Sequence, residues 1–129
     1  MALLLDTHVF LWLVHDPARL APSAARAVNV PAVPLYLSMA SVWELAIKKG
    51  RGKLELPLAL ADFVRTRLVR TDTQLLDVSL PHALAVAELP RHHGDPFDRM
   101  LVAPARAEGL TLVSADPGMS AYDVPVLWD

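Results

Sequence analysis

The sequence predicts an α/β fold in which a small parallel sheet is flanked by helices. Two observations support this: apolar runs of strand length recur along the chain, and segments with helical periodicity separate them. Helical segments between strands favour parallel pairing, because a parallel neighbour is reached only by a crossover connection. A length of 129 residues, with 53% hydrophobic and 20% charged residues, indicates one compact domain over residues 1–129.

The first half of the chain is predicted to contain two strands and three helices. The apolar runs Ala2–Leu5 and Leu35–Ser38 indicate the strands. Helical spacing of apolar residues indicates the helices His8–Val14, Pro22–Val28 and Ser41–Lys49. We expect Gly50 to end the third helix, because glycine commonly follows the last helical residue.

The second half continues the alternation. Strands are predicted at Gln74–Val78, Leu110–Val113 and Val124–Leu127, and helices at Leu58–Val69, Pro81–Glu88 and Pro96–Glu108. Pro104 lies inside the last helix, where a proline has no amide to donate and should kink the helix at a cost of about 3 kcal/mol. We expect the first turn, upstream of Pro104, to keep its place.

Four carboxylates stand where strands end or helices begin: Asp6, Glu44, Asp98 and Asp116. In an open parallel sheet, ligands bind in the crevice beyond the carboxyl ends of the strands. Converging acids about 4 Å apart repel by about 4 kcal/mol per pair at an effective dielectric constant of about 20, and a divalent cation removes this repulsion. Oxygen ligands suit Mg²⁺ or Mn²⁺. The pattern therefore predicts a metal site that activates water for phosphodiester hydrolysis.

The two acids in the first half also have a structural explanation. Asp6, or Thr7 beside it, can cap the helix that follows. Ser41 and Glu44 match a capping box, in which the glutamate bonds back to the serine amide. Capping alone would explain each residue taken singly.

Helix capping can also explain the acids in the second half of the chain. Asp95 precedes a proline and is a natural N-cap, with Asp98 in the first turn near the positive end of the helix dipole. Asp116 precedes Pro117 in the same way. Asp95 is either a cap or a more distant member of the metal site. The joint placement of the four acids, rather than any one of them, supports a metal site.

Five segments carry a resemblance to a known family: Leu3–His8, Ser41–Lys48, Gly52–Pro57, Asp95–Ala103 and Gly109–Pro117. Taken in this order, they resemble PIN-domain proteins, specifically the VapC-type toxin ribonucleases of bacterial toxin–antitoxin pairs. The segments span nearly the whole chain. Pro104 departs from the pattern, because the family usually keeps a helix-forming residue there.

The resemblance implies a three-layer α/β/α PIN fold and an endoribonuclease that depends on Mg²⁺, with Mn²⁺ as a substitute. Carried over by position, Asp6, Asp98 and Asp116 hold the metal, and Glu44 completes the shell or orients the attacking water. Ser114 stands where the family often has a hydroxyl residue close to the metal. The resemblance also implies an RNA substrate, a VapB-like antitoxin and a toxin homodimer. The alternative is a PIN-fold regulatory or protein-binding domain with little or no nuclease activity.

Basic residues cluster after the second acidic motif, at Lys48, Lys49, Arg51 and Lys53. They can stabilise the helix C-terminus or contact RNA phosphates. Arg99, which directly follows Asp98, is a further candidate phosphate contact alongside Lys48. His92 and His93 are interpreted as exposed loop residues, with a metal or proton-transfer role as the alternative.

Composition excludes several function classes. The chain has no cysteine, and therefore no disulfide, thiolate metal site or thiol nucleophile. Its net charge of −2 gives no global positive field for nucleic acid, so binding would depend on a local patch or a metal. No apolar run approaches the roughly 20 residues of a membrane span. We expect a cytoplasmic protein without membrane attachment.

Overall fold

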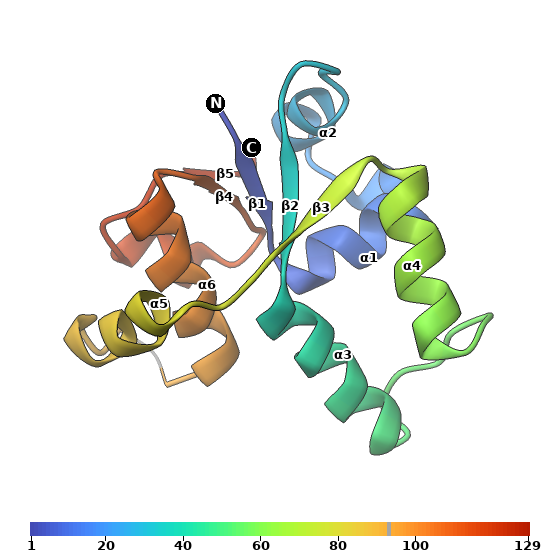
Figure 1. The fold of residues 1–129 in the computed structure, drawn as a ribbon. Coiled ribbons are helices and arrows are strands. Elements are labelled where there is room, and N and C mark those ends of the chain that lie inside the picture. The colour runs from blue at the N-terminus through green and yellow to red at the C-terminus, as the bar shows by residue number, and fades with distance from the viewer. Residues whose placement is uncertain (93) are drawn as a thin grey trace.

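A parallel sheet forms the centre of the computed structural model, which describes residues 1–92 and 94–129. His93, one of the two loop histidines considered above, lies outside the described residues. Helices cover both faces of the five-stranded sheet (Figure 1). The predicted α/β class, with helices on either side of a small parallel sheet, is confirmed.

The sheet consists of β1 (Leu3–Leu5), β2 (Leu35–Ser38), β3 (Thr73–Leu76), β4 (Thr111–Val113) and β5 (Val126–Leu127). Neighbouring strands are all parallel, in the spatial order β3-β2-β1-β4-β5. The chain moves outward from β1 to β3 and then crosses to the other side of β1 to form β4. The strand order therefore reverses between β1 and β4, and such a switch point is where open α/β sheets bind ligands.

The helices are α1 (Thr7–His15), α2 (Pro22–Val28), α3 (Met39–Gly50), α4 (Leu60–Arg70), α5 (Leu80–Ala85) and α6 (Pro96–Glu108). Short 3₁₀ segments occur at η1 (Pro17–Arg19), η2 (Val86–Glu88) and η3 (Pro117–Ala121). The helices α2 and α6 have the predicted bounds, and the others differ by a few residues at their ends. Prolines at the first or second position start several of these segments, where the missing amide costs nothing.

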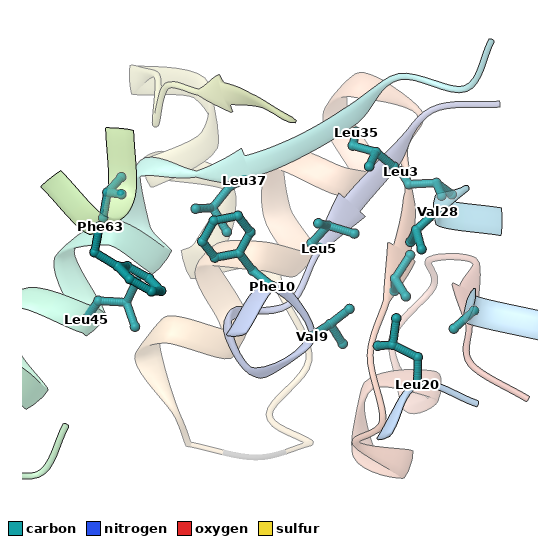
Figure 2. Packing of buried hydrophobic residues seen from close by; sticks show 13 residues of the cluster. Leu3, Leu5, Val9, Phe10, Leu20, Val28, Leu35, Leu37, Leu45 and Phe63 are labelled. Carbon is teal, nitrogen blue, oxygen red and sulfur yellow. The ribbon is translucent and has the colours of Figure 1, made fainter. Parts of the chain in front are cut away.

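Alternating side chains of β1 divide the core into two layers. Leu3 and Leu5 point to one face and pack with Phe10 of α1 and other apolar residues shown in Figure 2. Leu4 points to the opposite face, where it packs with Leu101 of α6. All of these side chains are essentially inaccessible to solvent. Burial on both faces fixes the strand register, because a slip of one residue would exchange the two layers.

The predicted capping box of Ser41 and Glu44 is wrong. Helix α3 begins two residues earlier than predicted, because Ser38 at the end of β2 is the N-cap and its Oγ accepts a hydrogen bond from the Ala40 amide at 3.0 Å. Ser41 therefore lies buried inside the helix. Both residues become available for contacts with other elements.

The end of α3 also differs from the prediction. Gly50 is the last helical residue, and the left-handed conformation falls on Gly52, whose φ is 69°. In contrast, α6 ends as predicted at Gly109, whose φ is 66°. Pro104 is buried within α6, which is helical over its full predicted length. The proposed kink at Pro104 remains a prediction.

In the described part of the chain, no helix is both long enough and apolar enough to cross a membrane.

Candidate metal centre

Asp6 is the buried centre of the site and stands directly after β1. Its amide donates to the Val113 carbonyl at 2.9 Å, which continues the pairing of β1 with β4 by one residue. One carboxylate oxygen accepts from the Thr7 amide at 2.7 Å, and the other accepts from Ser114 Oγ at 2.7 Å. Asp6 therefore caps α1, as the alternative interpretation predicted, and is also held against the end of β4 by Ser114.

Glu44 reaches the same region from α3 through a chain of hydroxyl groups. Thr7 Oγ1 lies 2.7 Å from Glu44 Oε1 and 2.8 Å from Ser41 Oγ. A carboxylate can only accept, so Thr7 donates to Glu44, and the same hydroxyl also contacts Ser41 Oγ. The second oxygen of Glu44 pairs with Lys48 Nζ at 2.9 Å. These contacts engage both carboxylate oxygens of Glu44.

The remaining acids are delivered by the N-terminus of α6 and the loop after β4. Asp95 is the N-cap of α6, and its Oδ1 accepts from the amides of Phe97 at 2.9 Å and Asp98 at 3.3 Å. Asp98 follows in the first helical turn. Asp116 is the N-cap of η3 and accepts from the Gly118 amide at 2.8 Å. The predicted capping roles of Asp95 and Asp116 are thus confirmed.

The four acids line one cleft of about 230 Å³. Among the described residues, its lining is Asp6, Thr7, His8, Leu11, Glu44, Lys48, Asp95, Asp98 and Asp116. Burial raises the pKa of Asp98 to about 7, and the charges of Asp6, Asp95, Asp116 and Glu44 raise it further in that order. Because the pKa of Asp98 depends on the charges of the other acids, the acids interact across the cleft.

Burial also raises the pKa of Asp6 above its usual value. The neighbouring His8 and the hydrogen bonds from Ser114 and Thr7 oppose this effect, and the charge of Glu44 adds to it. Two carboxyl groups whose charges are costly to maintain share one cleft. Such a site gains free energy from a bound cation.

The donor set fits Mg²⁺ or Mn²⁺, because it offers carboxylate oxygens and no thiolate. Among the described residues, no three acidic or histidine side chains stand close enough to hold one ion as they are placed. The acids therefore surround the cleft without forming a preformed cage. Accepting an ion requires rotation of carboxylates that now serve as caps or pair with Lys48.

The comparisons with known proteins decide the family. The family model described as PIN domain matches residues 3–125. The chain belongs to the PIN-domain family. The protein named Ribonuclease VapC22 from Mycobacterium tuberculosis is 31% identical to this PIN domain, with 95% of this chain and 92% of that protein covered.

Solved structures share the fold at lower sequence identity. The VapBC2 complex from Rickettsia felis, bound to a promoter DNA fragment, matches with a TM-score of 0.76 at 17% identity, and each chain is fully covered (100%). The DNA-bound VapBC complex from Salmonella typhimurium matches with a TM-score of 0.73 at 19% identity, covering 98% of this chain and 97% of that chain. Both likenesses support the three-layer PIN fold.

Arg99 has a role that the sequence did not indicate. Its guanidinium donates to the carbonyls of Pro90 at 2.8 Å, Val86 at 2.9 Å and Leu89 at 3.2 Å. A fourth contact joins it to the Tyr122 hydroxyl at 3.4 Å. Arg99 does not line the cleft. It fastens the segment before α6 to the helix in this PIN domain, and its contact with an RNA phosphate stays a prediction.

His8 is a member of the site that sequence reasoning missed. Its Nε2 accepts from the Ala115 amide at 3.2 Å, and its Nδ1 lies 3.5 Å from Asp6 Oδ1. The ring thereby connects α1 to the loop that carries Asp116. Its position two residues after Asp6 was the available signal. His92, by contrast, is exposed and packs edge-on against Tyr122 at 5.0 Å.

Proposed function

We propose that this PIN domain, extending over residues 1–129, is the toxin of a type II toxin–antitoxin system and cleaves RNA as a Mg²⁺- or Mn²⁺-dependent endoribonuclease. The observation that carries the proposal is the convergence of Asp6, Glu44, Asp98 and Asp116 on one cleft at the switch point of the sheet. The relative named Ribonuclease VapC22 and the VapBC complexes that share the fold support it.

The residues of the cleft would have different roles in the cleavage of RNA. Asp6, Asp98 and Asp116 would hold the metal, which when bound supplies a Lewis acid and lowers the pKa of water. Glu44, held in place by Thr7 and Lys48, would orient the attacking water and accept its proton. Ser114 supports the site by fixing one oxygen of Asp6. Lys48 places a positive charge at the cleft wall, where a scissile phosphate would approach.

The test is RNA cleavage by the purified protein after chelation, followed by addition of Mg²⁺ or Mn²⁺. We expect no cleavage with chelator and recovery with either ion. Asp6→Asn and Asp98→Asn should each lose cleavage while circular dichroism shows the same fold. Unchanged cleavage by either variant at equal Mg²⁺ would contradict the proposed roles.

The partners are proposed on the same basis. A VapB-like antitoxin is supported by the toxin–antitoxin complexes among the structures that share the fold. A homodimer is proposed from the family resemblance. Light scattering on the purified chain tests the homodimer, because a monomer has a mass of 14.1 kDa. Co-purification with the protein encoded by the neighbouring gene tests the antitoxin.

A second candidate function is a PIN-fold protein-binding or regulatory domain with little nuclease activity. It is favoured by the absence of a preformed three-ligand cage among the described residues and by the double engagement of the Glu44 carboxylate. Titration calorimetry separates the two. Binding of Mn²⁺ that Asp98→Asn abolishes supports the nuclease, and no Mn²⁺ binding supports the binding domain.

A further inference from the structure

Positive charge is concentrated in one short segment of the chain. Residues 45–54 contain Lys48, Lys49, Arg51 and Lys53 and no carboxylate, although the whole chain carries 12 basic and 14 acidic residues. This segment forms the end of α3 and the turn after it. In Figure 1, α3 runs from the end of β2 away from the sheet. A strongly basic segment, residues 45–54, thus lies on one side of the acidic cleft.

The backbone arranges three of these cations in line with the cleft. Glu44, Lys48 and Arg51 are spaced by four and three residues and therefore share one face of the helix. The backbone stays near helical through Arg51, whose amide donates to the Ile47 carbonyl at 3.1 Å. At Gly52 the chain reverses, and the Lys53 amide donates to the Lys48 carbonyl at 2.9 Å. We call Lys48, Arg51 and Lys53 the cationic ridge.

The outer two members of the ridge are available for a ligand. Arg51 and Lys53 are exposed, and neither forms an ion pair within the described part of the chain. Stabilisation of the helix dipole does not require them, because Lys48 and Lys49 already occupy the last turn of α3. Lys48, the inner member, is shared between the ridge and the cleft.

We propose that the cationic ridge binds the phosphates of a single-stranded RNA segment and leads that strand into the acidic cleft. This proposal rests on the proposed function. An acid-lined cleft repels a polyanion, so an adjoining track of positive charge is needed to hold the strand near the acids. The ridge contacts phosphates and carries no base specificity. Its direction, from Arg51 and Lys53 through Lys48 to Glu44, sets the path of the strand.

The test compares two double variants of the full chain. Arg51→Gln/Lys53→Gln removes the outer ridge. Arg26→Gln/Arg106→Gln is the matched control, because these exposed arginines lie in the last turns of α2 and α6, which lead to the opposite edge of the sheet. Binding of a short labelled single-stranded RNA is measured by anisotropy with chelator present, over a range of salt concentrations.

For the ridge variant we expect the plot of log K against log salt to become shallower by about 1.4, or about 0.7 per lost phosphate contact. This corresponds to binding about tenfold weaker at an ionic strength of about 0.15 M. In cleavage assays, KM should rise by a similar factor while kcat is unchanged. The control variant should match the wild type in both assays.

Three results would overturn the proposed role of the ridge. They are an equal loss of RNA binding in both variants, a fall of kcat with KM unchanged in the ridge variant, or no RNA binding by the wild type. Loss of antitoxin binding with unchanged RNA binding would reassign the ridge to an acidic protein partner. Failure of the proposed function gives a different pattern. In that event the wild type does not cleave RNA with any metal, while the ridge variant still binds RNA more weakly than the control variant.

Discussion

The hydroxyl of Thr7 connects two elements of the site with a single proton. Because it donates to Glu44 and also contacts Ser41 Oγ, the side chain of Glu44 is oriented by a residue that follows Asp6 directly. A hydrogen bond to a charged group contributes about 1.5–3 kcal/mol. Thr7→Val keeps the shape of the side chain and removes the bond, so we expect kcat for RNA cleavage to fall by about tenfold or more.

The matched variant for this prediction is Thr7→Ser, which retains the hydroxyl. It should recover most of the wild-type kcat, and thermal unfolding should show that both variants are folded. If Thr7→Ser loses as much kcat as Thr7→Val, packing of the methyl group rather than the hydrogen bond to Glu44 is what the reaction needs.

The surroundings of Asp98 make the charged form of its side chain unfavourable. Burial and four nearby carboxylates raise its pKa to about 7, so its charge is unfavourable at neutral pH without a metal. Asp98→Asn removes this charge, and we expect the metal-free variant to melt a few degrees above the wild type at pH 8. The gain is modest because the side chain is partly solvated. The same variant should lose more than about a hundredfold in RNA cleavage.

A higher melting temperature together with weaker RNA cleavage in Asp98→Asn would distinguish a metal ligand from a residue that only stabilises a helix terminus. If Asp98 only stabilised the start of α6 through the helix dipole, the asparagine variant would melt at a lower temperature and cleave RNA normally. Differential scanning fluorimetry with chelator, run beside the cleavage assay, gives both readings.

At the scale of residues, the sequence predicted the acids and the neighbouring Ser114, but not His8 or the contacts of Arg99. Asp6 and Asp116 were found because strand ends and helix starts can be recognised locally. The contacts of Arg99 were not predicted, because its acceptors are backbone carbonyls of a preceding segment, which no side-chain pattern marks. His8 was missed because its function depends on an amide more than a hundred residues away, at Ala115.

At the scale of elements, Asp95 ties the position of Asp98 to the start of α6. Its carboxylate caps two amides, and a lost N-cap costs about 1 kcal/mol. We expect Asp95→Ala to lower the free energy of unfolding by about that amount in urea titrations. Asp95→Asn, an equally good cap, should leave it nearly unchanged. If cleavage falls in Asp95→Asn as much as in Asp95→Ala, the Asp95 charge takes part in the site beyond capping.

The elements themselves were largely predictable, because apolar spacing and prolines mark their bounds. One of the differences is the start of α3, where two serines compete for the N-cap. Ser38 prevails because it ends β2 directly, and the helix then begins without a connecting loop. The error concealed the contact of Ser41 with Thr7, which only tertiary packing brings about.

For the molecule as a whole, the order of strands explains why the acids meet. Segments around residues 6, 44, 98 and 116 reach one cleft because β1 and β4 are neighbours and the helices after β1 and β2 begin at the same edge. The fold thus concentrates negative charge, which a bound cation would balance in the proposed function. Stability, metal binding and pH must therefore be linked.

The direction of this linkage follows from the raised pKa values of Asp98 and Asp6. In the folded metal-free protein, Asp98 keeps its proton up to about pH 7, whereas in the unfolded chain it loses it near 3.8. The folded state therefore binds more protons over this range, and this contribution to stability is lost as the pH rises from about 4 through 7. A divalent ion takes the place of the proton and binds more tightly as the pH rises.

We therefore expect the melting temperature with chelator to decline from pH 5 to pH 8, and saturating Mn²⁺ to raise it more at pH 8 than at pH 5. Asp98→Asn is the control and should flatten both trends, because the titrating group is gone. The measurement is a series of thermal melts at fixed ionic strength, with and without Mn²⁺. An equal effect of Mn²⁺ at both pH values would mean that the ion binds outside the cleft. A decline that persists unchanged in Asp98→Asn would place the titrating group elsewhere in the chain.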